Sequence, residues 1–550
     1  MRIGIDVGGT HADGAVVHNG RIIAKRKAAV GGGPLHKSIV SLLEQLVPEA
    51  REEAEYIHLS TTHCTNLVVN DRLAQTAMFI QAGPGLNPSF LACGEHVCFI
   101  SGAIDHRGKV VQELNTDQIE AAAENFTADN ISAAGIVTKF SHLNNQHETA
   151  VYKQIREKFR HISLGHRLSG RSNFPRRVYT AWLDSSLKQD FLKFCQEMEK
   201  GIKLLGFSCP LRILKADGGT MSLDMARENP GQTVHSGPSA SILGGLALIE
   251  DMQPDAVLLD IGGTTTDISL FAGGQPLFEP YGTEIASRPT LIRALLSRSA
   301  GLGGDSAVKY NGGKIMIGPE KTGRPAAFGG QAPTPTDAMM VLGMAGSFGS
   351  EEQIKKARQA IEKLMPDEKP LQAAEKILDT LVKAIRTKVY QVIDEVFSRP
   401  VYTISALLER KKIKPARIVA VGGPAAMLQP LLEREFGLPC LVPEHYEVAN
   451  AAGAALARQT IQLSLHADTE LGRATVPELS ITEDIPSSFG MDDAEARLKQ
   501  LISRQMPQTG QDEIEFTERF ETRIVKGGSY TGRIISLTCQ IRPGIAINKE

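Results

Sequence analysis

The sequence predicts an α/β protein with two similar lobes around a central cleft and a small α+β appendage at the C-terminal end. The first observation is an internal repeat, because Asp-Val-Gly-Gly-Thr at residues 6–10 returns as Asp-Ile-Gly-Gly-Thr at residues 260–264. The second is that helical and strand patterns alternate along most of the chain. The third is a change of pattern near residue 465. We therefore expect a first lobe at 1–245, a second at 246–464 and the appendage at 465–550.

Both copies of the repeat stand between strands. Apolar runs at 3–5 and 256–259 precede the glycines, and strand patterns follow at 12–17 and 267–271. The turns Asn-Gly and Gly-Gly then lead into third strands at 21–27 and 275–279, as in hairpins. A Rossmann fingerprint or a P-loop would instead run from the glycines into a helix, so both folds are disfavoured.

The remaining elements are assigned from the period of their apolar residues. Helices are expected at 35–46, 115–125, 147–159, 180–205, 351–398 with a break near Pro366, 425–436, 450–459 and 492–503. Strands are expected at 54–60, 75–80, 131–138 and 417–421. A linker is expected at 507–511, followed by a hairpin over 514–537 around Gly527-Gly528.

Composition excludes several classes of protein. The chain has 550 residues and a net charge of −2. This nearly balanced charge argues against binding of nucleic acid or an anionic membrane through the overall charge of the protein. Its 7 cysteines are scattered without a Cys-x-x-Cys pair, so a disulfide framework or a cysteine zinc site is not expected. No signal sequence or membrane span is visible. We expect a cytoplasmic protein without nucleic-acid or membrane partners.

The glycine turns carry the clearest chemical signal. A Gly-Gly turn exposes successive backbone N–H groups that hold phosphate oxygens. A carboxylate just before it, here Asp6 or Asp260, can hold Mg²⁺ through water. The hydroxyls of Thr10, Thr264 and Thr265 add donors. One copy alone would be an ordinary turn, but two copies facing each other would clamp a polyphosphate.

A third glycine turn follows the strand at 417–421. It reads Gly422-Gly423-Pro424 and opens the helix expected at 425–436. Glycine lets the backbone approach a ring or a phosphate, and a helix N-terminus favours negative charge. With the two repeats, this turn completes a set of two phosphate hairpins and a nucleoside turn.

These elements, in this order, resemble the actin- and hexokinase-like ATPase superfamily, and more closely the hydantoinase/oxoprolinase family in its ATP-binding A-subunit type. The resemblance covers roughly residues 1–460. The matching segments are 4–10, Phe174-Pro175-Arg176-Arg177 with Thr180-Ala181, 235–241, 259–267, Pro335-Thr336-Asp337-Ala338 and 449–454. It implies duplicated actin-like, ribonuclease H-like lobes with a nucleotide cleft between them.

The resemblance also implies an activity, namely ATP-dependent opening of cyclic amides such as hydantoins or 5-oxoproline, with a B-type partner subunit. ATP with Mg²⁺ would activate the amide oxygen by phosphorylation, and water would attack the carbon. The resemblance also implies site residues. The first phosphate site would consist of Asp6, Gly8, Gly9 and Thr10, and the second of Asp260, Gly262, Gly263, Thr264 and Thr265. Gly422, Gly423 and Pro424 would lie near adenosine. Asp6 and Asp260 would hold the metal. The catalytic candidates are Asp6, Asp260 and Asp267, and the base is not singled out among these and Asp13.

The sequence departs from the family pattern beside the expected cleft. His11 and Ala12 replace a bulky apolar residue and a hydroxyl, and the segment 59–66 lacks the family's leading His and Gly. Because these changes lie beside the expected cleft, they bear on which substrate the protein accepts and on whether it keeps the family's activity. Two other functions stay open, a small-molecule kinase and an ATP-driven reactivating or assembly factor, as does a homo-oligomer.

Weaker candidates have structural alternatives. Asp105 and His106 are either a metal or substrate contact or a plain turn. His58 and His63 are expected to be neutral and hydrogen-bonded rather than ligands, and Cys64 is not expected to be a nucleophile, because neighbours in a strand face opposite ways. The segment 174–177 is either an anion site, a solvated basic turn or an interface salt bridge.

Overall fold

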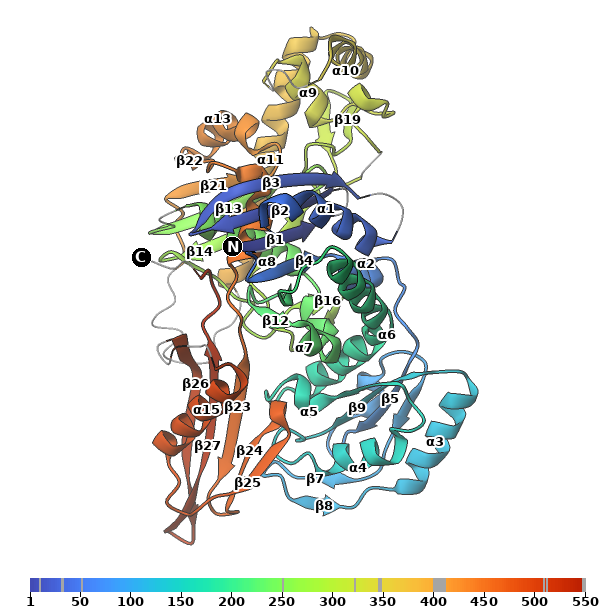
Figure 1. The fold of residues 1–550 in the computed structure, drawn as a ribbon, viewed down its shortest axis with the longest axis vertical. Helices are drawn as coiled ribbons and strands as arrows, with labels where there is room; N and C mark the ends of the chain where they lie inside the picture. The colour runs from blue at the N-terminus through green and yellow to red at the C-terminus, as the bar shows by residue number, and fades with distance from the viewer. Residues whose placement is uncertain are drawn as a thin grey trace.

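The computed structural model describes residues 1–8, 11–30, 34–50, 53–249, 252–320, 323–344, 349–398, 412–507, 510 and 513–546. Two central sheets lie in the middle of an elongated molecule (Figure 1). A helical region of the second half stands above them. An inserted α/β unit of the first half and a separate C-terminal β unit extend below.

The first central sheet has the strand order β12-β11-β4-β1-β2-β3. Its strands are β1 (Arg2–Val7), β2 (His11–His18), β3 (Arg21–Ala29), β4 (Tyr56–Thr61), β11 (Leu211–Leu214) and β12 (Thr220–Ser222). β2 is antiparallel to β1 and β3, whereas β4 is parallel to β1 and β11. Asn19 and Gly20 both have positive φ, which is the backbone that a tight two-residue hairpin requires.

The second central sheet repeats this arrangement in the order β15-β14-β13-β21-β22. Its strands are β13 (Asp255–Ile261), β14 (Thr266–Ala272), β15 (Gln275–Pro276), β21 (Arg417–Val421) and β22 (Cys440–Leu441). β14 is antiparallel to β13, and β21 is parallel to it, as in the first sheet. Each half therefore begins with the same hairpin at the same place in its sheet.

The expected third strand at 275–279 is too long. β15 ends at Pro276, and the rest of the β14 edge is paired with β18 (Ser297–Ala300). Since one edge of a strand can pair with only one partner at each position, β18 leaves β15 only two residues.

Two helices cross between the central sheets, α8 (Ser236–Leu248) and α14 (Ala449–Leu456). A Cβ atom on Gly453 would lie only 2.5 Å from the carbonyl oxygen of Ala240 and would clash with the backbone of Gly244. The helices therefore meet backbone against backbone. α8 leads the chain from the first half into the second, and α14 packs on β1, where a Cβ on Gly4 would clash with Ala451.

The inserted unit of the first half contains a parallel sheet in the order β10-β9-β5-β6. Its strands are β5 (Thr76–Gln81), β6 (Val97–Phe99), β9 (Ala133–Thr138) and β10 (His161–Leu164), with the small hairpin β7 (Ala103–Ile104) and β8 (Val110–Gln112) beside it. The helices of the first half are α1 (Leu35–Ala50), α2 (His63–Val69), α3 (Thr116–Ala128), α4 (Gln146–Ile155), α5 (Gly165–Leu168), α6 (Phe174–Leu204) and α7 (Leu223–Glu228).

The helix expected at 180–205 starts earlier than predicted. α6 begins at Phe174 because the Asn173 side chain accepts a hydrogen bond from the N–H of Arg176 and Pro175 stands in the first turn, a position where proline costs no hydrogen bond. The segment 174–177 is therefore helical rather than a turn.

The second half carries a helical region over its sheet. Its elements are α9 (Pro335–Val341), α10 (Glu351–Leu364), α11 (Pro370–Ser398), α13 (Ala425–Phe436), and the short strands β19 (Val308–Asn311) and β20 (Lys314–Ile317). The second half also contains the two-stranded pair β16 (Glu284–Ile285) and β17 (Arg288–Pro289), which lies on the other side, near α6. The break between α10 and α11 falls at Pro366, where it was expected.

The C-terminal unit is an antiparallel sheet in the order β25-β24-β23-β27-β26, packed against α15 (Met491–Gln505). Its strands are β23 (Gln462–Asp468), β24 (Arg473–Val476), β25 (Ile481–Asp484), β26 (Ile514–Lys526) and β27 (Ser529–Ile541). Leu465, Leu498 and Leu537 belong to a separate buried core. Of the expected linker 507–511, residues 508, 509 and 511 lie outside the described residues. Over the part of the chain that the structure describes, no helix is long and apolar enough to cross a bilayer.

Candidate active site

The two Gly-Gly hairpins have the same geometry. The N–H of Gly8 donates to the carbonyl of His11 at 2.9 Å, and the N–H of Gly262 donates to the carbonyl of Thr265 at 2.9 Å. Asp6 stands opposite Asp13 in one hairpin, as Asp260 does opposite Asp267 in the other. Gly9 and Thr10 lie outside the described residues, so their predicted phosphate contacts stay predictions.

Asn450 at the start of α14 brings the two repeats together. Its Nδ2 lies 3.3 Å from Oδ2 of Asp6 and 3.1 Å from Oδ2 of Asp260. One amide thus donates to carboxylates from both halves of the chain. The Ser241 hydroxyl on α8 donates to the same oxygen of Asp260. The crossing helices therefore form a floor on which both predicted metal-binding carboxylates are held.

Burial and mutual repulsion shape the charges of this cluster. Burial raises the pKa of Asp6 to about 7, and the nearby charges of Asp13 and Asp260 add to the rise. Burial also raises the pKa of Asp267 to about 6, with the charge of Asp260 as the next cause. For Asp13, burial raises the pKa while Lys27, with Nζ 3.1 Å from Oδ1, opposes the rise. Carboxylates that repel one another in this way favour a cation between them.

The residues present fit a hydrated cation. The buried Oδ1 atom of Asp6 accepts no hydrogen bond within the described residues, so it can accept from water held by Mg²⁺. Among those residues, no group of three or more His, Cys, Asp or Glu side chains is arranged to hold a metal directly. Water-mediated binding of Mg²⁺ by Asp6 and Asp260 stays a prediction.

The second hairpin is braced by a loop that the sequence interpretation missed. The N–H groups of Gly304 and Asp305 donate to the carbonyls of Gly262 and Gly263. The hydroxyl of Thr336 in turn donates to the Asp305 carboxylate at 2.9 Å. The signal that could have found this loop is the glycine-rich run Gly301-Leu302-Gly303-Gly304-Asp305. Ser241 and Asn450 were identified only as parts of matching segments, without a role.

The third glycine turn lies against the second hairpin. Gly422 has φ +91°, and a Cβ there would come 2.7 Å from Oδ1 of Asp260, so only glycine fits. A Cβ on Gly423 would meet open space. Pro424 caps α13. The structure therefore places Gly422 beside Asp260, and Gly423 has room in front of it for a ligand. Thr264 and Thr265 stand half-buried at the hairpin tip.

The histidines and cysteine near residue 60 have structural roles. His58 is fully buried, its Nδ1 lies 2.8 Å from the carbonyl of Ala454, and burial lowers its pKa to about 3. Burial also lowers the pKa of His63. Cys64 is buried and its thiol pKa is raised, so it is no activated nucleophile. Both His63 and Cys64 lie in α2 rather than in a strand, so the reason given for excluding Cys64 was wrong.

The two remaining candidates make contacts that hold the fold, and a metal or substrate contact at Asp105 and His106 stays a prediction. The Asp105 carboxylate accepts from the N–H groups of Arg107 and Lys109 at 2.9 Å, which closes the turn between β7 and β8. Arg176 donates to carbonyls at 281, 282 and 290. Arg177 is fully buried and donates to Ser141. Arg176 and Arg177 thus contact other parts of the chain from a helix, so the solvated turn was wrong, whereas the anion site and the interface salt bridge stay predictions.

Comparison with known proteins covers most of the chain. A family model described as Hydantoinase/oxoprolinase matches residues 177–463, and one described as Hydantoinase/oxoprolinase N-terminal region matches residues 2–159. The caprolactamase subunit alpha of Pseudomonas jessenii is 26% identical over 255 residues, which are 44% of this chain and 36% of that protein. An uncharacterized protein of Schizosaccharomyces pombe is 24% identical over 380 residues, 64% of this chain and 28% of that protein. The matched residues thus span little more than a third, or less, of these relatives.

Two solved structures match the whole chain. The ATP-dependent caprolactamase from Pseudomonas jessenii has a TM-score of 0.74 at 19% identity, covering 100% of this chain and 88% of that one. Nucleotide-free acetone carboxylase has a TM-score of 0.70 at 16% identity with the same coverages. These likenesses confirm the predicted fold class, duplicated actin-like lobes.

Proposed function

Because this chain belongs to the hydantoinase/oxoprolinase family, we propose that it is an ATP-dependent hydrolase that opens cyclic amides. The observation that carries the proposal is the Asn450 amide, which donates to the hairpin aspartates of both halves. Such a bridge holds the two hairpins close to one carboxamide, as binding of one polyphosphate by both would require. The caprolactamase name of one relative supports a cyclic amide of the lactam, hydantoin or 5-oxoproline type as substrate.

ATP would lie between the two hairpins. The backbone N–H groups around Gly8–Thr10 and Gly262–Thr265 would hold its phosphates, and the turn Gly422–Pro424 would lie near adenosine. Asp6 and Asp260 would hold Mg²⁺ through water, where it would screen phosphate charge. The short Gly303–Asp305 loop supports this role, because it braces the backbone of Gly262 and Gly263.

The chemistry needs an activated amide and a base. ATP would supply a phosphoryl group for the amide oxygen and leave as ADP. Water would attack the ring carbon, the ring C–N bond would break as the nitrogen takes a proton, and hydrolysis of the resulting acyl phosphate would release phosphate. The chain positions the reactants and accepts a proton. Asp6 and Asp267 are the candidates for this role; Asp267, which is not proposed to hold the cation, is the better suited, because burial raises its pKa to about 6.

A B-type partner would complete the enzyme. The relative from Pseudomonas jessenii is named as an alpha subunit, and the matched part of this chain spans only 36% of it. We therefore propose that ring opening requires a second polypeptide, and that this chain contributes the phosphorylating half of the reaction.

The test is ATP turnover by the purified chain, with and without the partner, in the presence of hydantoin, 5-oxoproline and caprolactam. Stimulation by one of these, lost in Asn450→Ala, is the expected result. Asp367→Ala is the control, since Asp367 is exposed on a loop between α10 and α11. Turnover that no cyclic amide stimulates would refute the substrate class, and turnover unchanged in Asn450→Ala would refute the bridged cleft.

A further inference from the structure

A serine, a histidine and a glutamate form a hydrogen-bonded chain where the inserted unit meets the C-terminal unit. The Ser480 hydroxyl oxygen lies 2.9 Å from Nε2 of His166, and Nδ1 of the same ring lies 2.5 Å from Oε2 of Glu148. Ser480 belongs to the C-terminal unit, whereas His166 in α5 and Glu148 in α4 belong to the inserted unit. A serine nucleophile, its base and the carboxylate that orients the base follow one another in the same order in serine hydrolases.

The neighbours of this chain determine the direction of its hydrogen bonds. Nε of Arg167 donates to the Ser480 hydroxyl oxygen at 2.8 Å, because a guanidinium can only donate. Burial alone would raise the pKa of Glu148, but the charge and the hydrogen bonds of His166 hold that pKa below its ordinary value. Glu148 is therefore ionised and accepts the proton of Nδ1. In the neutral ring Nε2 is then the acceptor, and Ser480 donates to it.

The base and its carboxylate are held in one orientation. Glu148 is fully buried, and it accepts from the N–H of Thr138 at 2.9 Å and from the N–H of His166 at 3.0 Å. The His166 side chain is also buried. Since neither side chain has room to turn, Nε2 stays directed at Ser480 before any substrate binds, as catalysis by positioning requires.

Ser480 has a backbone conformation that few serines adopt. Its φ of 54° and ψ of 31° lie in the left-handed region, which is uncommon for a residue with a Cβ atom. Its N–H donates to the carbonyl of Pro477 at 2.9 Å, which closes the sharp turn between β24 and β25. Just before it, the Glu478 carboxylate accepts from the N–H groups of Gly170 and Ser464 at 3.0 and 3.1 Å. A nucleophilic serine is presented on a strained turn in the same way in α/β-hydrolases.

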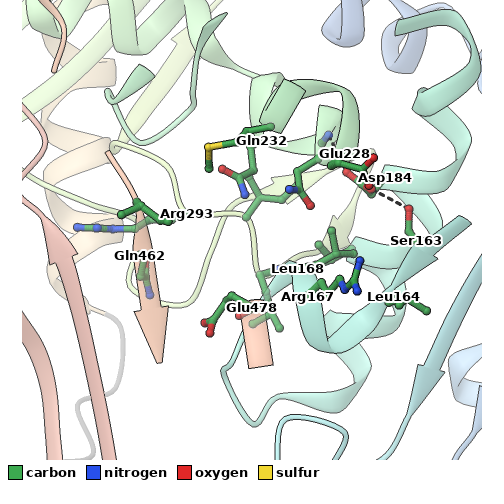
Figure 2. A pocket seen from close by; sticks show the side chains of 18 of the residues that line it. Ser163, Leu164, Arg167, Leu168, Asp184, Glu228, Gln232, Arg293, Gln462 and Glu478 are labelled. Atoms are coloured by element: carbon green, nitrogen blue, oxygen red, sulfur yellow. Dashed lines mark hydrogen bonds between the residues drawn. The ribbon is translucent and has the colours of Figure 1, made fainter. Parts of the chain in front are cut away.

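A cavity of about 630 Å³ adjoins this turn. Glu478 and Leu479, which directly precede Ser480, contribute to its lining, as do Arg167 and Leu168. Figure 2 shows Arg167, Leu168 and Glu478 together in the lower part of the view. The volume is typical of small-molecule sites. Basic and acidic side chains line the cavity in equal number, so it fits an uncharged molecule better than an ion.

The serine hydroxyl can be reached from solvent. Ser480 is half-buried, Arg167 is exposed, and the hydrogen bond between them lies at the surface. Within the described part of the chain, the Arg167 guanidinium makes no other hydrogen bond or ion pair. Its remaining N–H groups are thus available to a carbonyl oxygen bound next to Ser480, where they would stabilise the negative charge of a tetrahedral intermediate.

We propose that Ser480 and His166, oriented by Glu148, form a second active centre that hydrolyses small uncharged carboxylic esters without ATP. The Ser480 oxygen attacks the acyl carbon and passes its proton to Nε2 of His166, while Arg167 stabilises the carbonyl oxygen. The ester C–O bond breaks, the alcohol leaves with the proton from His166, and the acyl group stays on Ser480. Water then attacks this acyl-enzyme, His166 takes the proton of the water and returns it to Ser480, and the carboxylic acid is released. This activity goes beyond the proposed ATP-dependent function and does not rest on it.

The first experiment is covalent labelling of the full chain by diisopropyl fluorophosphate, without nucleotide. This probe phosphorylates activated serine hydroxyls and loses fluoride. We expect one diisopropylphosphoryl group per chain, located at Ser480 by peptide mass spectrometry, and none in Ser480→Ala. His166→Gln should slow the labelling by about 10²-fold or more, because it removes the base. No label at Ser480, or an unchanged rate in a folded His166→Gln variant, would overturn the proposal.

Hydrolysis of para-nitrophenyl butyrate, followed by absorbance, is the second measurement. Ser480→Ala should abolish it, and Arg167→Gln should lower it by about 10²-fold; the latter variant keeps the fold, since Arg167 is exposed. Ser536→Ala is the matched control. Its hydroxyl lies 3.1 Å from Nδ1 of His466, but Nε2 of that ring lies 2.8 Å from the Gly170 carbonyl rather than a carboxylate. This control should keep full activity. Full activity in Ser480→Ala, or an equal loss in Ser536→Ala, would mean that Ser480 only joins the two units.

Discussion

The hairpin of the first half, β1 with β2, and that of the second half, β13 with β14, share one backbone but differ in their neighbours. Asp6 faces Asp13 just as Asp260 faces Asp267. Next to β2 stands the nine-residue β3, which places Lys27 against Asp13. Next to β14 stands β18, which places Ser299 opposite Asp267.

The same position in the parallel strand differs as well. His58 of β4 lies beside Gly4 in the first sheet, whereas Val419 of β21 lies beside Leu258 in the second. His58 is hydrogen-bonded to α14, while Val419 belongs to an apolar core. Duplication has therefore preserved the backbone of the site, and the adjoining strands have given its two halves different electrostatics.

The largest expected effect tests whether both halves are needed. Asp260→Ala and Asp6→Ala should each lower ATP turnover by roughly 10³-fold, because each removes a carboxylate that we propose holds the phosphate-bound cation. Phosphate release measures this. Asp367→Ala should keep full activity. A fully active Asp6→Ala would mean that the second hairpin works alone and that the two halves are not equivalent.

The contact between the halves is tested at the helix crossing. Gly453→Val should lower the free energy of unfolding by about 3 kcal/mol, because the added atoms clash with the backbone of α8. Urea unfolding followed by circular dichroism measures the loss.

The control is Gly237→Ala in α8, where a Cβ would meet no atom within 4 Å. This change should stabilise the helix by about 0.5–1 kcal/mol. Equal stability of Gly453→Val and the unaltered chain would show that the helices do not pack so closely.

One pH dependence of stability should come from His58 of the first half, whose counterpart in the second half is the non-titrating Val419. Burial lowers the folded-state pKa of His58 to about 3, while unfolding restores a value near 6.5. The unfolded chain therefore binds the additional proton below pH 6.5, and stability is lost as the pH falls from there toward 3. At pH 5 the loss from this residue is about 2 kcal/mol relative to pH 8.

Urea unfolding at both pH values measures that loss. In His58→Gln the difference between pH 8 and pH 5 should shrink by about 2 kcal/mol, whereas exposed His18→Gln should leave it unchanged. An unaltered pH dependence in His58→Gln would mean that other groups cause it.

The smallest expected effect concerns the strands next to β2 and β14, where the two halves differ. Lys27→Met removes the cation that opposes the raised pKa of Asp13, so that pKa should rise further. Since the Lys27 side chain is 49% exposed, the change in ATP turnover should stay within about threefold. A pH–rate profile measures it, and a shift toward lower pH in the variant would contradict the assignment.

Local patterns predicted much of this molecule. The two hairpins, their Asn-Gly and Gly-Gly turns, and the helix starting at Ala425 follow from the period of apolar residues and from turn chemistry. These signals act over about ten residues, so one sequence suffices to detect them. The repeat then predicted two lobes, and the family resemblance predicted which fold they form.

The bounds of other elements can be predicted only when the neighbouring residues and strands that set them are known. The end of β15 at Pro276 depends on β18, which pairs with the same edge of β14. The start of α6 at Phe174 depends on the Asn173 cap, which lies outside the apolar pattern. In both cases a residue beyond the pattern decided the boundary.

The sequence by itself determined the repeated hairpins, the chemistry of their aspartates and glycines, and the fold class. Only the tertiary structure decided that Asn450 joins Asp6 and Asp260, which lie 444 and 190 positions away in the chain. It also decided that the inserted unit, the first central lobe and the C-terminal unit together line one cavity. The reason is that turns and periodicity are local interactions, whereas these contacts exist only after whole lobes have packed against each other.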